Sequence, residues 1–204
     1  ERHEALGIAH FQQSGTGRIR AYYNYLLTTP LVGEGLTGLG KRQSLEDERA
    51  WPGYYSARFG ESAISCEVTC SQRCAVHRYE FPAGARGRVA VDLSAGGLLI
   101  EGMRSYPGSA RVELAGDAGA QGVIWMEGIP IFFRIEVRGA RRSGLWLKGK
   151  ESTAKLFEEI PESEEGEENP PFGVWFEAGR PDEPLELRIG FSLRSEERAV
   201  EALK

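Results

Sequence analysis

The sequence predicts an all-β protein, a two-sheet antiparallel β-sandwich with a short C-terminal helix. Short runs of alternating apolar and polar residues recur at nearly regular spacing and are separated by Gly, Pro, Ser or Asp. This pattern is typical of sandwiches and barrels. The chain also contains 26 glycines and no βαβ rhythm, which disfavours a parallel doubly wound sheet.

The expected strands are short. In chain order they fall at residues 22–27, 54–59, 64–81, 89–93, 98–101, 111–114, 123–126, 131–137, 145–148, 174–177 and 185–191. The segment 64–81 is long enough to break into two strands near Gln72. It ends before Pro82, because proline cannot donate a hydrogen bond within a central ladder.

The C-terminal residues predict a different element. Ser195 can cap a helix that continues to Leu203. A helix that follows the last strand is typical of a linker, and we expect it to point away from the sandwich toward a further domain. The chain is therefore divided into a sandwich over residues 1–194 and the start of a linker helix over residues 195–204.

Composition narrows the class of protein. With 204 residues the chain can bury a core without disulfides or metals. It carries 30 acidic and 25 basic residues, a net charge of −5, which argues against nucleic acid as the main partner. No apolar run approaches the roughly 20 residues of a membrane span. No signal peptide is visible, and the secreted, periplasmic and cytoplasmic alternatives stay open.

Three cysteines, Cys66, Cys70 and Cys74, are spaced by four residues. An odd number is a poor disulfide framework. Because four is an even number, an extended strand directs all three side chains to one face, which is the apolar one, and places His77 on the polar face. We therefore expect reduced, mostly buried thiols in preference to a metal or redox site.

Residues 158–168 hold seven glutamates. Such a run cannot bury enough apolar surface to order itself, so an exposed loop is predicted. A calcium site is the alternative interpretation, although calcium needs oxygen ligands at defined turn positions as well as negative charge.

Catalytic motifs are scarce. The histidines are His3, His10 and His77, and no HExxH, GxSxG, CxxC or phosphate-loop motif is present. The glycine-rich SGTG at residues 14–17 by itself indicates a tight turn.

Three blocks of the sequence are similar to one known family, in order and at plausible spacing. GIAHFQQSGTG at residues 7–17 resembles GFSHTHLSGTG, with Phe11 and Gln12 in place of a Thr and a second His. SLEDERAWPGYYSARF at residues 44–59 resembles SHExExAxPGYYxV, with Leu45 in place of a His. CEVTCSQRCAVHRYEFP at residues 66–82 resembles xELTxTxRVGxHRYxFP.

The closing segment RIGFSLRSEERAVEAL also resembles a pattern of that family, VGISxVSxExAxxNL. Together the blocks cover nearly all of the chain. The sequence is thus similar to the N-terminal β-sandwich domain of glycoside hydrolase family 92, the calcium-dependent exo-α-mannosidases. Members usually carry a further stretch upstream, so we expect either a trimmed fragment or a sandwich that has lost strands.

The resemblance implies a supersandwich-type domain joined to a C-terminal (α/α)6 barrel that removes terminal mannose with inversion. In this family the two catalytic carboxylates and the calcium ligands belong to the barrel. It therefore implies no catalytic or metal-binding residue in this chain, calcium as the cofactor of the full-length enzyme, and no hydrolysis by the chain alone.

The resemblance also places the sandwich against the barrel, where it helps to wall the substrate pocket. The candidate substrate-binding residues are His10, Gln12, Ser14 and Thr16. A loop rich in glycine and hydroxyl groups lets backbone donors approach a sugar, and the His10 ring can donate or accept a hydrogen bond. The alternative is that His10 ties down its own loop. We also expect an apolar surface beside this loop, where the barrel packs.

Other matched residues have simpler interpretations. Glu46 and Glu48 precede the turn at residues 51–53 and are interpreted as solvated charges or members of a structural ion pair. For His77, cross-strand pairing is sufficient. Trp51 is either a platform for a sugar or, more commonly, a buried anchor.

Two further functions stay open beside the mannosidase domain. One is a free-standing carbohydrate-binding β-sandwich without hydrolytic activity. The other is a structural or interaction domain of the same fold. The partners expected are the barrel of the same polypeptide and a mannose-containing glycan.

Overall fold

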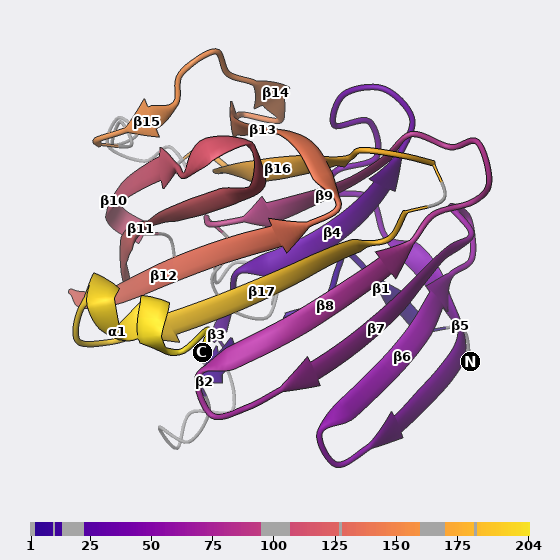
Figure 1. Ribbon diagram of the computed structural model, residues 1–204, viewed down its shortest axis with the longest axis horizontal. Helices are drawn as coiled ribbons and strands as arrows, with labels where there is room; N and C mark the ends of the chain where they lie inside the picture. The colour runs from indigo at the N-terminus through magenta and orange to yellow at the C-terminus, as the bar shows by residue number, and fades with distance from the viewer. Residues whose placement is uncertain are drawn as a thin grey trace.

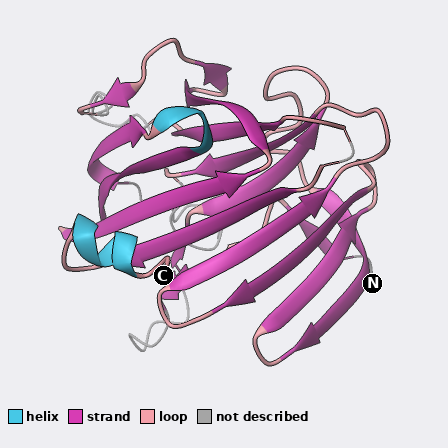
Figure 2. Cartoon of the chain, viewed as in Figure 1, coloured by secondary structure: helices cyan, strands magenta, loops and turns pink. Residues whose placement is uncertain are grey.

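The computed structural model describes residues 3–9, 11–13, 23–94, 107–126, 128–159, 170–181 and 183–204. These residues form two antiparallel sheets that pack face to face, and a two-stranded ribbon (Figure 1). The predicted all-β sandwich is confirmed. Figure 2 shows how little of the chain is helical.

The large sheet has ten strands. Their order is β1 (His3–Ala5), β5 (Gln43–Trp51), β6 (Tyr54–Phe59), β7 (Ile64–Cys70), β8 (Cys74–Glu80), β17 (Leu185–Ser192), β12 (Ile129–Arg138), β11 (Gly119–Met126), β10 (Pro107–Leu114) and β15 (Leu156–Phe157). The two meanders, β5 to β8 and β10 to β12, are joined by β17, which comes from the end of the chain.

The small sheet has five strands. Their order is β14 (Lys150–Glu151), β13 (Ala140–Leu147), β16 (Phe172–Ala178), β9 (Gly87–Asp92) and β4 (Leu27–Val32). The separate ribbon consists of β2 (Phe11–Gln13) and β3 (Tyr23–Tyr25). The helical elements are a 3-10 turn, η1 (Gly116–Ala118), and α1 (Glu196–Glu201).

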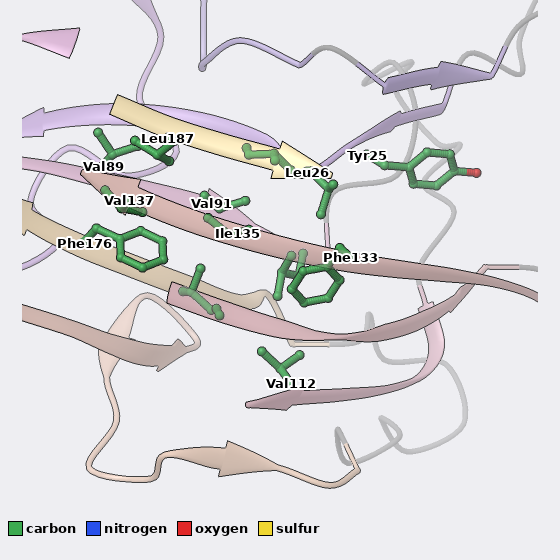
Figure 3. Packing of buried hydrophobic residues seen from close by; sticks show 14 of the residues in the cluster. Tyr25, Leu26, Val89, Val91, Val112, Phe133, Ile135, Val137, Phe176 and Leu187 are labelled. Atoms are coloured by element: carbon green, nitrogen blue, oxygen red, sulfur yellow. The ribbon is translucent and has the colours of Figure 1, made fainter. Parts of the chain in front are cut away.

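The core lies between the two sheets. Along β12, every second side chain from Ile131 to Val137 is buried, which is the alternation expected of a strand with one face in the core. Figure 3 shows Phe133 and Ile135 of β12 near Val91 of β9, in the space between the layers. The apolar positions of both sheets therefore meet in one continuous cluster.

Most predicted strands are confirmed, and β6 has the predicted bounds. The predicted strand at residues 98–101 lies outside the described residues. Six strands were not predicted: the short β1, β2, β14 and β15, and the longer β4 and β5. In β4, Pro30 reads as a terminator, yet β4 is the edge of the small sheet, where a missing N–H group is tolerated. In β5, the side chains after Leu45 are exposed, so no apolar alternation marks the strand.

The predicted helix cap is confirmed. The Ser195 hydroxyl accepts a hydrogen bond from the Arg198 amide, at 3.4 Å. Ala199 and Leu203 are buried, and a Cβ atom on Gly190 of β17 would lie 2.4 Å from the carbonyl oxygen of Ala199. The expectation that this helix points away from the sandwich is therefore wrong, because glycine lets α1 lie directly on the large sheet.

The cysteine prediction is partly confirmed. Cys66 and Cys74 are buried and all three thiols are free, but Cys70 is exposed. The segment 64–81 forms a hairpin with a turn before Cys74, and the buried face of β8 carries His77, which is 0% exposed. The placement of His77 on a polar face is therefore wrong, because the turn breaks the continuous alternation assumed from the sequence.

A thiol reagent should distinguish these cysteines. Burial raises the pKa of the Cys66 thiol to about 12 and also raises that of Cys74, and only the thiolate is nucleophilic. We expect one rapidly labelled thiol per native chain and none in Cys70→Ser. Rapid labelling of Cys66→Ser at two sites would contradict this prediction.

Candidate functional site

The N-terminal segment is attached to β4 just before the candidate loop. The Ile8 amide donates to the Thr28 carbonyl at 2.9 Å, and the Thr28 amide donates to the Ile8 carbonyl at 3.0 Å. The Thr29 hydroxyl donates to the Leu6 carbonyl at 3.0 Å. Residues 6–8 are thus held on the edge of the small sheet by both backbone and side-chain bonds.

Gly7 is required by this close approach. A Cβ atom there would lie 2.5 Å from the Thr28 carbonyl oxygen and 2.7 Å from the Thr29 hydroxyl oxygen. These distances are far below van der Waals contact with backbone that cannot move freely. The glycine that opens the first matched block is therefore explained by packing.

Residues 11–13 of the candidate loop form β2, one of the two strands of the ribbon. Strands β2 and β3 pair with Phe11 opposite Tyr25 and Gln12 opposite Asn24. Tyr25 is 3% exposed and belongs to the core, and β4 follows it directly. The ribbon is therefore connected along the chain to the small sheet, although its described strands do not pair with that sheet.

The predicted site residues are placed only in part. Gln12 lies in β2, whose backbone is described. His10, Ser14 and Thr16 lie outside the described residues. Their contact with a sugar, and the alternative that His10 ties down its own loop, stay predictions.

The carboxylates of the second and third matched blocks have partners on the large sheet. Glu46 pairs with Arg58 at 2.8 Å, and Glu67 pairs with Arg78 at 2.9 Å. Glu67 also accepts a 2.5 Å hydrogen bond from the Tyr54 hydroxyl. These bonds cross between neighbouring strands, which is how charged pairs stabilise a sheet.

Glu48 joins the first strand of the sheet to this hairpin. Its carboxylate contacts the His3 ring at 2.6 Å and accepts a 2.8 Å bond from the Tyr55 hydroxyl. The bond from Tyr55, and then that with His3, lowers the pKa of Glu48. The ion-pair interpretation is confirmed for Glu46, whereas Glu48 is held by a histidine ring and a tyrosine hydroxyl.

His77 belongs to a polar group inside the sandwich. Its Nδ1 atom lies 3.0 Å from the Tyr79 hydroxyl, and Tyr79, also buried, pairs across the hairpin with Cys66. Burial raises the pKa of Tyr79 well above its usual range, so the phenol stays protonated. These side chains satisfy one another in the core.

A buried ion-pair network was missed by sequence reasoning. Arg88 of β9 contacts Glu177 of β16 through Nε at 2.9 Å and Nη2 at 2.5 Å. Arg141 of β13 contacts the other oxygen of the same carboxylate through Nε at 2.8 Å, and Arg88 also contacts Glu151 at 2.5 Å. The side chains of Arg88 and Glu177 are 6% and 1% exposed.

An aromatic ring completes this network, which we call the Arg88–Glu177 network. The guanidinium carbon of Arg88 lies 4.6 Å from the centre of the Trp175 ring, and that of Arg142 lies 5.8 Å from it. Both distances are typical of cation–π contacts. The sequence signal was a charged residue next to an apolar run: Arg88 opens RVAV, and Glu177 closes VWFE.

No metal site is found in the described part of the chain. There, no group of three or more His, Cys, Asp or Glu side chains is arranged to hold an ion. Most of the glutamate-rich run at residues 158–168, for which a calcium site was the alternative, lies outside the described residues, which stop at Glu159 and resume at residue 170. The described residues therefore offer no ligand set for calcium, which the resemblance assigns to the barrel.

Exposed apolar side chains do not gather beside the candidate loop. Within the described residues, the exposed large apolar side chains are Trp51, Ile129, Leu193 and Val200. None belongs to the small sheet or to residues 3–9. The expected apolar surface beside the loop is therefore not found in the described ranges. These ranges also contain no helix long and apolar enough to cross a bilayer.

Comparison with known proteins gives one family. Residues 1–192 match the family described as the glycosyl hydrolase family 92 N-terminal domain. No individual curated protein matches the sequence significantly.

Solved structures with the same fold belong to that family. The family GH92 α-mannosidase BT3965 from Bacteroides thetaiotaomicron, solved with mannoimidazole, superposes with a TM-score of 0.72 at 15% identity, covering 98% of this chain and 27% of that chain. The family GH92 inverting mannosidase BT2199 of the same organism superposes with a TM-score of 0.61 at 16% identity, covering 90% of this chain and 25% of that chain. The GH92 family glycosyl hydrolase ccman5 superposes with a TM-score of 0.70 at 18% identity, covering 97% of this chain and 27% of that chain.

The attachment of the candidate loop can be tested at Gly7. Gly7→Ala forces Cβ against the Thr28 carbonyl, and overpacking of this kind costs about 1–3 kcal/mol. We expect a lower free energy of unfolding and faster hydrogen exchange of the Ile8 and Thr28 amides. Ala5→Gly, at the end of β1, is the control and should leave those amides protected. Unchanged exchange in Gly7→Ala would contradict the proposed packing.

The Arg88–Glu177 network predicts a pH dependence of stability. Burial raises the pKa of Glu177, but Arg141 and Arg88 more than offset this, so the pKa is lowered overall. A carboxylate with a lowered folded pKa stabilises the protein above its unfolded pKa of about 4.3, and this contribution is lost as the pH falls further. Glu177→Gln should therefore flatten the acid limb of the stability curve.

The same substitution should be costly at neutral pH, because it removes the buried carboxylate that Arg88 and Arg141 share. The buried Arg88 is then left with only the partly exposed Glu151 as a counter-ion. We expect Glu177→Gln to lower the free energy of unfolding by about 3–5 kcal/mol. Glu46→Gln, which breaks the exposed pair with Arg58, should cost less than about 1 kcal/mol. Equal costs in urea titrations at pH 7 would show that the network is not stabilising.

Proposed function

The chain belongs to the glycosyl hydrolase family 92 N-terminal domain family, and from this premise we propose that it is the sandwich domain of an α-mannosidase that removes terminal α-linked mannose with inversion. The observation that carries the proposal is the family match over residues 1–192. Two similar structures support the substrate class, because one is described as an α-mannosidase and the other as an inverting mannosidase.

The catalytic groups are assigned to a barrel of the same polypeptide. The chain spans about a quarter of the length of the solved relatives, 27% of the α-mannosidase. An inverting glycosidase needs two carboxyl groups about 6.5–9.5 Å apart. In this sandwich Glu46, Glu67 and Glu177 are each held by arginine, which suits structural anions and not a proton donor. Calcium is also assigned to the barrel, as the family resemblance implies.

The role of the sandwich is to support one wall of the substrate pocket. The attachment of residues 6–8 to β4 and the pairing of β2 with β3 fix both approaches to the segment that holds His10, Ser14 and Thr16. This support favours a substrate-binding role for His10, Gln12, Ser14 and Thr16.

The helix provides the connection to the barrel. We assign residues 1–194 to the sandwich and residues 195–204 to the start of the linker. Because α1 packs on β17, the chain leaves the sandwich in a fixed direction from the large sheet. Packing of this kind suits two domains that hold a pocket between them.

A free-standing carbohydrate-binding sandwich is the second candidate. The observation in its favour is that the core is closed by the chain itself, with both sheets contributing buried side chains. The two candidates differ in their prediction for a longer polypeptide, because only the mannosidase needs a barrel.

Mannose release separates the two candidates. The polypeptide encoded by the complete reading frame and the isolated chain of 204 residues are incubated with an α-mannobioside, and the products are followed by NMR. We expect the longer protein to release β-mannose first and to lose activity with a calcium chelator, and the isolated chain to release none. Release by the isolated chain would overturn the assignment of the catalytic groups.

The pocket wall is tested by His10→Ala in the longer protein. Loss of one sugar hydrogen bond should lower kcat/KM about tenfold or more, since each 1.4 kcal/mol is a factor of ten. His3→Ala is the matched control, because His3 contacts Glu48 on the large sheet, and its kcat/KM should be unchanged. Equal values for both variants would show that His10 does not contact the substrate.

A further inference from the structure

Trp51 is the most exposed large apolar side chain among the described residues. It is 55% exposed and lies at the end of β5, where the β5–β6 hairpin turns through Pro52 and Gly53. Its ring stacks on that of Tyr54, with centroids 4.2 Å apart and planes inclined by 15°. The expectation of a buried anchor is therefore wrong: Tyr54 supports one ring surface and the side chain stays accessible.

The supporting ring is itself held in place. The Tyr54 hydroxyl donates a 2.5 Å hydrogen bond to Glu67, which is fixed by Arg78. The Thr69 hydroxyl donates to the Gly53 carbonyl at 2.7 Å, which ties the turn to β7. The orientation of the Trp51 ring is thus set before any ligand arrives, and a preorganised aromatic surface loses little entropy on binding.

The surroundings of the ring decide what kind of ligand it fits. Beside the supporting Tyr54 the sheet surface carries the ion pairs of Arg78 with Glu67 and Glu80. The other exposed large apolar side chains, Ile129, Leu193 and Val200, belong to β12 or follow β17. A protein interface needs an apolar centre within roughly 800 Å² per partner, and one ring does not supply it.

A sugar fits this combination. A pyranose ring has an apolar C–H face about as large as an indole and hydroxyl groups around its edge. Stacking would cover the exposed indole, while carboxylates and guanidinium groups nearby can accept and donate hydrogen bonds to hydroxyls. Anionic lipid surfaces are disfavoured by the carboxylates of Glu67 and Glu80.

We propose that Trp51, supported by Tyr54, is a binding platform for a neutral hexopyranose unit of a glycan. The platform would hold a polymeric or branched substrate at a second point. It depends on the proposed function only for the choice of mannan as the first ligand to test.

The experiment is affinity electrophoresis of the isolated chain in gels that contain soluble α-mannan, with dextran and galactomannan as other neutral glycans. We expect retardation of the native chain by at least one of these polymers. Trp51→Ala should bind about tenfold more weakly, which corresponds to about 1.4 kcal/mol of lost stacking. Trp51→Phe, which keeps a smaller ring, should fall between the two.

Leu193→Ala is the matched control, because it removes another exposed apolar side chain and should bind like the native chain. Circular dichroism and thermal unfolding establish that each variant is folded. The proposal is overturned if the native chain is not retarded by any of the polymers, if Trp51→Ala and Leu193→Ala bind equally, or if the substitution changes self-association or vesicle binding instead.

Failure of the platform and failure of the proposed function are distinguishable in the longer protein. If the platform exists, Trp51→Ala should slow mannose release from mannan while leaving release from an α-mannobioside unchanged. Absence of any mannose release from either substrate would reject the mannosidase proposal, whereas equal rates of the variant and the native protein on mannan would reject the platform alone.

Discussion

Strand β17 holds the large sheet together. Its residues pair with β12 from Glu186 to Ser192 and with β8 from Leu185 to Gly190. Without it the sheet would consist of two separate meanders, each with a long open edge, and open edges invite non-native pairing. Leu185, Leu187 and Ile189 of β17 are fully buried, so the strand is fixed by the core as well as by hydrogen bonds.

The sequence predicted the strands that β17 joins better than those at the edges. Central strands have one face in the core, and their alternation is visible in the sequence, as in β12. Strands at or next to an edge lose that signal: β4, at the edge of the small sheet, contains Pro30, and β5, flanked only by the three-residue β1, is polar over most of its length. The face of His77 was wrong because a short turn changed the alternation between β7 and β8. Single-strand patterns do not specify such turns.

For the candidate site, the family resemblance indicated which residues matter, but the sequence could not predict which side chains they contact in the fold. Two charged pairs of the second and third blocks, Glu46 with Arg58 and Glu67 with Arg78, cross between neighbouring strands of β5 to β8, so a structural role in this half-sheet accounts for them. Gly7 in the first block is explained by its approach to β4. Arg88 and Glu177 are 89 residues apart in sequence, and only the pairing of β9 with β16 brings them together.

The use of charge in this domain bears on where chemistry takes place. A catalytic acid needs a raised pKa, which requires burial without a cation nearby. Glu48, Glu67 and Glu177 have lowered pKa values, because tyrosine, histidine or arginine groups stabilise their carboxylates. Carboxylates stabilised as anions resist protonation at the pH where a general acid must donate. These three carboxylates are therefore held as structural anions, and their environment is the opposite of the one that a general acid for a glycosidic bond requires.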